Sequence, residues 1–489
     1  MSRGLERSDL LPHRARRTRK RDGARRAVCL AVIGVGIALV VLTWPLERQS
    51  SAANATPRVS TALFSPRRVP QSVTEAAAAP RLAARINEAI AGSDASCVLV
   101  HAPGLGTVAD IRSTRPLAGA STQKILTALA ALTVLGPEFR YETKIVADSP
   151  NANGVVAQAT LLGGGDPVLA TAEYRTHIEE TPLLRGRAST ALESLADQLT
   201  QRSVKSIGVL VVDDSRYDSV RFLPTWRANY ATEGQAGGLG ALVVNDGYSA
   251  WKPDRTPARD PALDAGQAFA ALLRARGVPV TEVRRTPNPP SGAALVAVQS
   301  PPLRDIAASM LRSSNNTTAE LITRELAVAK GQPGTTPEGV TVITETMQQM
   351  GVPMGGVTLL DGSGLTRDNQ VTCAALLGAL QAGQGPTALH DLLAVAGTSG
   401  TLAKRFSGTP LAGALYAKTG TLNGITGLTG YVETYRSLSF ALIANSGVSD
   451  DGAAFALQSR VANALRSFPG DLRLDLPTPS APCTAGPCR

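Results

Sequence analysis

The sequence predicts a mixed α/β (α+β) protein in which one helix-and-strand domain is split by a β-rich insert. Three observations predict this arrangement. Segments with the apolar spacing of helices flank a middle region whose short apolar runs are separated by Pro and Gly. Two strand-like runs and a helix-like run follow one another near the C-terminal end. A chain of 489 residues is also too long for one compact domain and fits two or three.

The first flanking region holds a predicted strand and a predicted central helix. Residues 79–92 have the apolar spacing of a helix, and residues 96–103 form a buried strand-like run. Another helix is predicted to begin at Ser121. Because residues 125–135 are apolar nearly all round, we expect this helix to lie in the centre of the domain. A Gly-Pro pair directly after it ends the helix.

The remaining elements follow the same patterns. In the middle region, strands are predicted over 154–166, 206–215 and 240–247, and a helix over 265–277. Beyond it, helices are predicted over 305–314, 317–331 and 451–468, and strands over 427–434 and 437–446. The Pro-rich residues 469–489 are interpreted as a tail.

The N-terminal segments predict export of the body of the chain. Residues 27–46 are predicted to be a transmembrane anchor or signal segment, since the uncharged apolar run 27–44 spans roughly 27 Å as a helix, close to the thickness of a bilayer core. The basic tail before it (1–26) is then cytoplasmic, and the body is extracytoplasmic on a single-pass membrane protein. Residues 47–78 are predicted to be a disordered linker. A cleaved signal, with a site at 53–55, stays open and would make the protein secreted.

The charge distribution argues against nucleic acid as a partner. Residues 1–26 carry ten basic and three acidic side chains, which is +7 of the chain's net +10. The rest of the chain is nearly neutral, and aromatic residues make up only 4% of the sequence. The body therefore lacks both the basic face and the stacking platform of a nucleic-acid binder.

Cysteine and histidine usage predicts neither a metal centre nor any cofactor. The chain has five Cys and four His, and no group of them has the spacing of a zinc site. Cys97 and Cys373 lie in apolar segments and are predicted to be buried thiols. Cys483 and Cys488 are hypothesised to close a small disulfide loop outside the cell.

A Ser-x-x-Lys pattern at the start of the central helix suggests a nucleophile and its base. Ser121 and Lys124 are three positions apart, so a helix places them on one face, where the amine can take the hydroxyl proton. The pattern alone is weak, because an N-cap serine and a solvated lysine also explain it. The chain repeats it at Ser249 and Lys252, where no apolar helix follows.

Two further patterns occur in the order known from active-serine enzymes. Residues 313–320 contain Ser-x-Asn, and the single Lys-Thr-Gly of the chain, at residues 418–420, directly precedes a predicted strand. Ser-x-x-Lys, Ser-x-Asn and Lys-Thr-Gly together are the signature of penicillin-binding proteins and serine β-lactamases. Ser-x-Asn fits two overlapping registers here, starting at Ser313 or at Ser314.

On these motifs the chain, from about residue 80 to 468, resembles the class C low-molecular-mass penicillin-binding proteins. These are the D-alanyl-D-alanine carboxypeptidase/endopeptidase family of peptidase family S13 type. The stretches 161–170, 211–218, 361–369 and 396–406 also resemble that family. Lys124 and Ser314 lie 190 positions apart, and the family places its insert in this gap. The resemblance implies a transpeptidase-like, β-lactamase-like catalytic domain made of 79–145 and 300–468, with one or two small inserted domains in 146–299.

The resemblance assigns the catalytic roles. Ser121 would attack the carbonyl between two terminal D-alanines, Lys124 would take its proton, and Ser314 would relay that proton to the departing D-alanine. The following Ala319-Glu320 pair selects the register of Ser314, as the family usually has Ala-Glu at this distance. Lys124 must be neutral to act as the base, and a nearby cation with partial burial would lower its pKa; Lys418 is the candidate.

The resemblance also assigns the substrate-binding residues. Asn316 would donate to the amide carbonyl of the substrate, and Lys418, Thr419 and Thr421 would hold its terminal carboxylate. Backbone N–H groups of Ser121 and Thr421 would form the oxyanion hole. Gly420 would let the substrate lie close along the strand edge.

The implied function is trimming of peptidoglycan peptides that end in D-Ala-D-Ala, through an acyl-serine intermediate. Endopeptidase action on cross-links is open beside carboxypeptidase action. β-Lactams would act as covalent inhibitors because they mimic the substrate. A β-lactamase or esterase on the same fold, and a non-catalytic cell-wall-binding protein, are the alternative interpretations.

Overall fold

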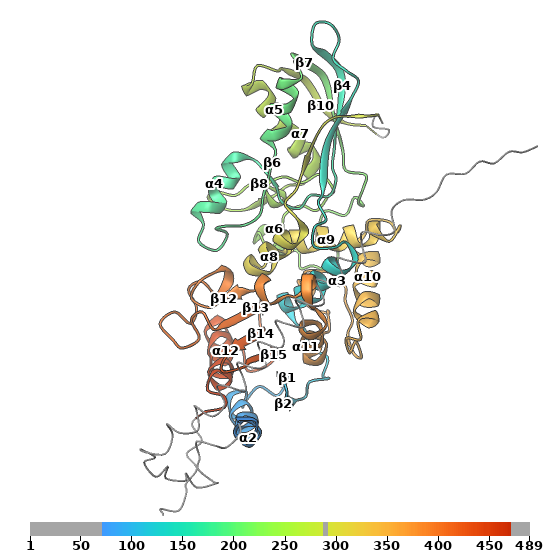
Figure 1. Ribbon diagram of the computed structural model, residues 1–489. Helices are drawn as coiled ribbons and strands as arrows, with labels where there is room; N and C mark the ends of the chain where they lie inside the picture. Colours follow the sequence, from blue (N-terminus) through green and yellow to red (C-terminus); the bar gives the residue numbers. More distant parts are fainter. Residues whose placement is uncertain (1–70, 287–291, 471–489) are drawn as a thin grey trace, which may run out of the picture. The chain divides into compact units, whose positions relative to one another are not determined.

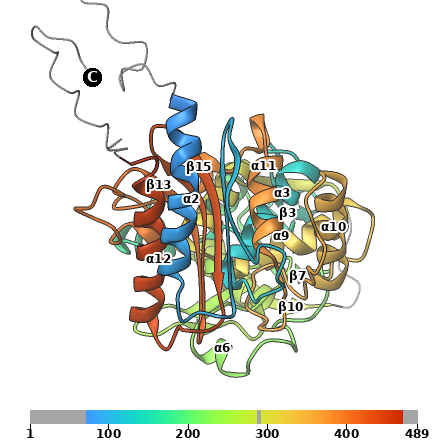
Figure 2. The same cartoon turned by 90° about the horizontal axis from the view of Figure 1, so that it is seen from below.

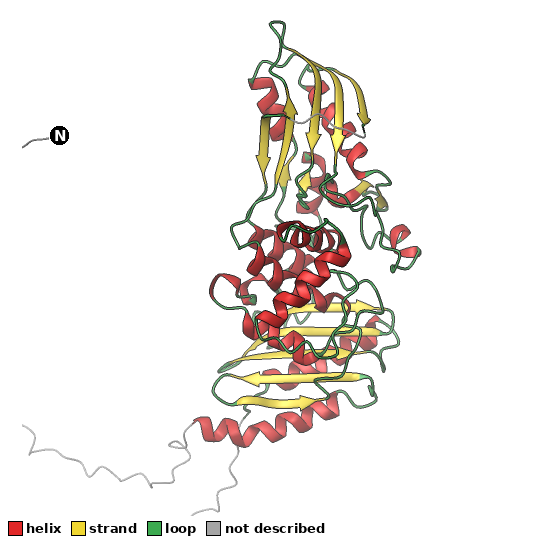
Figure 3. Cartoon of the chain, turned by 90° about the vertical axis from the view of Figure 1, so that its right-hand side faces the viewer, coloured by secondary structure: helices red, strands yellow, loops and turns green. Residues whose placement is uncertain are grey.

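The computed structural model describes residues 71–286 and 292–470, which belong to one compact unit (Figure 1). The predicted basic tail, the membrane segment 27–46 and Cys483 and Cys488 lie outside the described residues. None of the described helices is long and apolar enough to cross a membrane. Two large β-sheets, two small two-stranded sheets and the helices packed on them make up the described part of the chain (Figure 3).

The first sheet is antiparallel, with strand order β12-β13-β14-β15-β1-β2. Its strands are β1 (Ser96–Ala102), β2 (Gly106–Ile111), β12 (Ala394–Val395), β13 (Leu415–Leu422), β14 (Ile425–Glu433) and β15 (Ser437–Ala444). Helices cover both faces, so the central strands β14 and β15 are buried almost throughout, without the alternation of a half-exposed strand. In β15, every residue after Ser437 is buried.

Helices α2 (Gln71–Ala89) and α12 (Asp451–Arg466) lie side by side on one face of this sheet (Figure 2). Helix α2 starts within the predicted linker 47–78, because a run of four alanines favours helix and its apolar face packs against the sheet. The C-terminal strands and α12 fall where the sequence predicts them, with ends displaced by one to two residues.

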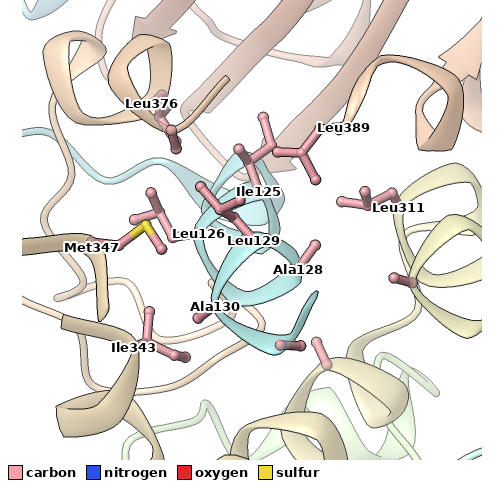
Figure 4. Close-up of a cluster of buried hydrophobic side chains, with 14 of the residues drawn as sticks. Ile125, Leu126, Ala128, Leu129, Ala130, Leu311, Ile343, Met347, Leu376 and Leu389 are labelled. Atoms are coloured by element: carbon pink, nitrogen blue, oxygen red, sulfur yellow. The ribbon is translucent and has the colours of Figure 1, made fainter. Parts of the chain in front are cut away.

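The opposite face of the sheet packs against a group of helices centred on α3 (Lys124–Val134). The surrounding helices are α8 (Leu303–Ser313), α9 (Asn316–Ala329), α10 (Thr336–Gln349) and α11 (Cys373–Ala382). Leu311, Ile343 and Leu376 from three of these helices point at α3 (Figure 4). All residues from Lys124 to Leu132 are buried, which confirms the prediction of a central helix.

The insert forms a second sheet, with strand order β10-β7-β4-β3-β11. Its strands are β3 (Glu142–Ala147), β4 (Val155–Leu162), β7 (Ser206–Asp213), β10 (Val280–Arg285) and β11 (Ala294–Gln299). Strands β4, β7 and β10 are parallel, and α5 (Glu193–Gln201) and α7 (Pro261–Ala275) pack on the sheet. Parallel neighbours need helical crossovers, so the insert is α/β in character rather than only β-rich.

Shorter elements complete the insert. They are β5 (Leu169–Ala170), α4 (Ala172–Glu180), β6 (Thr190–Ala191), α6 (Asn229–Thr232), β8 (Tyr248–Ala250) and β9 (Thr256–Pro257). The paired strands β3 and β11 carry the chain into and out of the second sheet. Since β3 begins at Glu142, the second sheet starts four residues before the predicted boundary at residue 146.

The predicted strand over 240–247 is wrong. Its apolar residues are buried, but they pair with no strand, and the run ends in a tight turn. Asn245 and Asp246 adopt left-handed backbone conformations (φ 55° and 56°), which an extended ladder does not tolerate. The apolar run therefore indicates burial between the hydrophobic core of the second sheet and a neighbouring apolar cluster, and not β pairing.

The prediction of two buried thiols is also wrong, because Cys97 and Cys373 form a disulfide. Both residues are fully buried, as expected, but the bond joins β1 to the first residue of α11 across 276 positions of sequence. Burial of each cysteine follows from its apolar neighbours in the sequence. Their meeting depends on how α11 packs on the sheet, which no local pattern shows.

Candidate active site

The first motif lies at the N-terminal end of α3. Ser121 belongs to a short 3₁₀ turn, Ala120–Gln123, and Lys124 is the first residue of the α-helix that follows. Lys124 Nζ donates a hydrogen bond to Ser121 Oγ over 2.9 Å. The half-buried serine and the buried lysine therefore stand in the geometry of a nucleophile and its base.

The second motif lies where α8 ends and α9 begins. Ser314 closes α8 in a left-handed conformation (φ 60°), and Asn315 caps α9 by accepting from the Thr318 N–H. Asn316 then points back to the first motif, with its Oδ1 accepting from Lys124 Nζ over 2.6 Å. These contacts favour the register that begins at Ser314.

The third motif lies on β13. Lys418 is fully buried, and its Nζ donates to Ser314 Oγ over 2.8 Å. Thr419 Oγ1 donates to Thr401 Oγ1 over 3.0 Å, and both side chains line the same cleft as Ser121 and Thr421. The structure thus brings the three motifs together, with each lysine bonded to a serine of the cleft.

The structure gives a reason for a glycine at position 420 that differs from the predicted one. A Cβ at this position would lie 2.7 Å from the Gly119 carbonyl oxygen and 3.1 Å from the Thr122 nitrogen. Because side chains do not fit at such distances, the glycine lets the turn that carries Ser121 pack directly on β13. It therefore sets the distance between the first and third motifs.

Burial dominates the electrostatics of both lysines. Desolvation lowers the pKa of Lys124 to about 7, although the carboxylates of Asp361 and Glu320 act in the opposite direction. The pKa of Lys418 is lowered first by burial and then by the charge of Lys124. A nearby cation together with partial burial was expected to lower the pKa of Lys124, and removal of water is the largest effect.

A loop that sequence reasoning did not assign holds Lys124 from the other side. The Ser363 carbonyl oxygen accepts from Lys124 Nζ over 2.6 Å. The buried Glu320 fixes this loop, because its carboxylate accepts from the Gly362 and Ser363 N–H groups. The loop lies in the stretch 361–369, which resembles the family, but no spacing rule links it to the lysine.

Asp361 ties the same loop to the insert. Its Oδ1 accepts from the Gly364 N–H, and its Oδ2 accepts from the Thr366 N–H, each over 2.7 Å. The Trp226 indole N–H, which comes from the insert, donates to the same Oδ2 over 3.0 Å. The insert therefore helps to position the carbonyl group that orients Lys124.

Replacing Trp226 by phenylalanine should lower the acylation rate of Ser121 by about fivefold to tenfold, because a hydrogen bond to a charged group is lost. The rate is measured with a fluorescent penicillin, and the urea midpoint is measured in parallel to separate positioning from stability. Trp251→Phe is the matched control, since Trp251 packs on Tyr174 and does not line the cleft. Equal rates for the two variants would contradict the role of Trp226.

The insert also contacts the second motif. Asn316 Nδ2 donates to the Gln235 carbonyl oxygen over 2.7 Å, and the Gly237 N–H donates to Thr317 Oγ1 over 2.9 Å. These bonds fix the amide so that its oxygen faces Lys124. The cleft has a volume of about 280 Å³ and is lined by residues of both the catalytic part and the insert.

Two other features do not belong to this site. Ser249 Oγ donates to the Thr256 carbonyl oxygen, while the exposed Lys252 pairs with Glu180, so the second Ser-x-x-Lys brings no base to its serine. A larger cavity of about 720 Å³, lined in part by Tyr141 and Tyr217, contains no residue of the three motifs.

Comparison with known proteins identifies the family. The sequence profile of the D-Ala-D-Ala carboxypeptidase 3 (S13) family matches residues 79–256 and 249–466. The chain belongs to this family. A member of the S13 family is a peptidase and therefore a hydrolase. Both halves of the catalytic part and the insert between them lie within the matched residues.

Proteins related in sequence align with most of this chain. Carboxypeptidase DacB of Mycolicibacterium smegmatis is 32% identical over 88% of this chain and 95% of its own length. The D-alanyl-D-alanine carboxypeptidase of an Actinomadura strain is 26% identical over 95% of each chain. Penicillin-binding protein 4 of Haemophilus influenzae has the same fold, with a TM-score of 0.65 over 78% of this chain and 99% of its own, at 21% identity.

Proposed function

We propose that the protein removes the last D-alanine from peptidoglycan stem peptides through an acyl-enzyme on Ser121. The contact that carries this proposal is the hydrogen bond between Ser121 Oγ and a buried Lys124 whose pKa is lowered to about 7. The names of the relatives in the S13 family support the same substrate class.

Acylation follows from the contacts of the three motifs. Ser121 Oγ attacks the carbonyl carbon of the D-Ala-D-Ala amide while its proton passes to the neutral Lys124 amine, 2.9 Å away. The amide C–N bond then breaks, and Ser314 relays this proton to the departing nitrogen. The hydrogen bond from Lys418 Nζ orients the Ser314 hydroxyl for that transfer.

Binding and deacylation use the remaining residues. Lys418, Thr419 and Thr421 surround the terminal carboxylate with an amine and two hydroxyls as hydrogen-bond donors, while Asn316 faces the peptide carbonyl. The backbone N–H groups of Ser121 and Thr421 stabilise the oxyanion, each by about 3 kcal/mol. Water then attacks the ester, gives a proton to Lys124, and releases the shortened peptide as Ser121 recovers its proton.

A fluorescent penicillin tests the proposal on the wild-type protein. We expect stable labelling, with the adduct mapped by mass spectrometry to the peptide that contains Ser121, together with release of D-alanine from an acyl-D-Ala-D-Ala peptide. No labelling of the folded protein, or an adduct at Ser249, would sink the proposal. Rapid turnover of the penicillin would instead indicate a β-lactamase.

We also infer that the catalytic part works outside the cytoplasm, attached to the membrane through residues 27–46 or released after cleavage. The disulfide between Cys97 and Cys373 supports this placement, because such bonds persist in oxidising compartments. Cell fractionation with N-terminal sequencing of the mature protein tests it. A full-length, reduced protein in the soluble cytoplasmic fraction would contradict the inference.

A further inference from the structure

Two arginines of the insert line the active-site cleft, and only one of them forms an ion pair. Arg187 makes a bidentate ion pair with Asp246, with N–O distances of 2.7 and 2.8 Å. The Tyr174 hydroxyl donates to the same carboxylate over 2.7 Å. Both ion-pair side chains are 5% exposed. The carboxylate of Asp246 is therefore already occupied by three donors.

Arg255 is the second arginine, and it lines the same cleft as Ser121. Its side chain is exposed and makes no ion pair with any carboxylate of the described residues. It donates a long hydrogen bond of 3.5 Å from Nη1 to the Gly234 carbonyl oxygen, and its charge also acts on the Tyr248 hydroxyl and the Asp246 carboxylate. Arg187 and Arg255 thus share the single negative charge of Asp246, and the wall of the cleft keeps an excess positive charge.

The surroundings of Arg255 hold its side chain in place. Gly234 has φ +62°, and a Cβ there would lie 2.7 Å from Arg255 Cβ and 3.1 Å from its Cδ. The guanidinium lies over the Tyr248 ring, 5.6 Å from its centre, and the Tyr248 hydroxyl donates to the Gly234 carbonyl oxygen. Gly234, which has no side chain, and the Tyr248 ring together position the arginine. Less conformational freedom is therefore lost when a ligand binds.

We propose that Arg255 binds a second carboxylate of the peptide substrate, separate from the terminal carboxylate assigned to Lys418 and Thr419. This inference rests on the proposed function. The planar guanidinium pairs with carboxylates in a bidentate manner, and an aromatic face behind it leaves its outer edge free for that purpose. The insert then selects acidic peptides, while the three motifs perform the chemistry.

The second carboxylate can lie upstream or downstream of the scissile bond. Three peptides distinguish these two positions. The neutral peptide is acetyl-L-Lys(acetyl)-D-Ala-D-Ala. The upstream acidic peptide replaces the N-terminal acetyl group by an N-acetylated, γ-linked D-glutamyl residue with a free α-carboxylate. The downstream acidic peptide has D-Glu as the leaving residue. The measured quantity is kcat/KM, followed by release of the C-terminal amino acid.

We expect the wild-type protein to prefer one of the acidic peptides over the neutral one by about tenfold, as a partly shielded charge-assisted pair allows. Arg255→Gln should bring this ratio close to one, and Arg255→Glu should bring it below one. Arg259→Gln is the matched control, because Arg259 is also exposed but does not line the cleft. It should keep the wild-type ratio.

A ratio near one in the wild-type protein that hydrolyses the neutral peptide would overturn the role of Arg255 and leave the proposed function intact. An equal loss for all three peptides in Arg255→Gln would also overturn it, because that result indicates a structural role. If no peptide is hydrolysed and no penicillin is bound, the proposed function fails, and the inference about Arg255 fails with it.

Discussion

Replacing Lys124 by alanine should lower the acylation rate of Ser121 by about 10³- to 10⁴-fold, which approaches the complete loss expected for Ser121→Ala. The lysine is fully buried and bonds to Ser121, Asn316 and the Ser363 carbonyl, so no other described amine takes its place at the serine. The rate is measured with a fluorescent penicillin at pH 8.

The pH dependence of the wild-type rate gives an independent readout of the same residue. Because the pKa of Lys124 is lowered to about 7, its amine is protonated below that pH and neutral above it. A base must be neutral to accept a proton, so kcat/KM should rise as the pH passes through about 7 and level off about one unit above it. At pH 6, roughly one tenth of the lysine is neutral, and the rate should fall about tenfold below the plateau.

The matched control for Lys124→Ala is Lys252→Ala, which removes the exposed lysine of the second Ser-x-x-Lys. That variant should keep both the wild-type rate and its pH profile. A rate in Lys124→Ala within tenfold of wild type would contradict the assignment of the base. A wild-type rate that decreases as the pH rises through 7 would contradict it as well, since protonation would then favour the reaction.

The sequence predicted the polar groups of the site better than the groups that position them. Ser121, Lys124 and Lys418 lie in short motifs whose spacing reflects the chemistry. The structure places both lysines in hydrogen-bond contact with the second motif, and Lys124 also with Ser121. Trp226 and Glu320 act through backbone and carboxylate contacts that bring distant segments together. Such contacts leave no local pattern, because any segment with a suitable donor or acceptor could supply them.

The same distinction applies to the fold. Central strands such as β15 and the helix α3 were predictable because burial on all sides makes a segment continuously apolar. The segment 240–247 is also rich in apolar residues, but it packs between the hydrophobic core of the second sheet and a neighbouring apolar cluster, and it has no strand partner. Apolar runs therefore predicted burial, while strand pairing and the crossing of the chain between the two sheets depended on tertiary contacts.

The second large effect expected is on stability. Replacing both Cys97 and Cys373 by alanine should reduce the free energy of unfolding by about 5 kcal/mol, because the bond closes a loop of 276 residues in the unfolded chain. Changing both residues avoids leaving a reactive thiol in the core. The urea midpoint of the purified protein, insert included, followed by far-ultraviolet circular dichroism, measures the loss.

Reduction by dithiothreitol provides the matched control, because it should lower the midpoint of the wild-type protein and leave the double variant unchanged. Neither cysteine lines the cleft, but both belong to the buried cluster that packs around α3, the helix that carries Lys124. At low temperature and without urea, the double variant should therefore still be acylated by penicillin. A midpoint that neither reduction nor the double substitution lowers would show that packing between β1 and α11 suffices without the covalent bond.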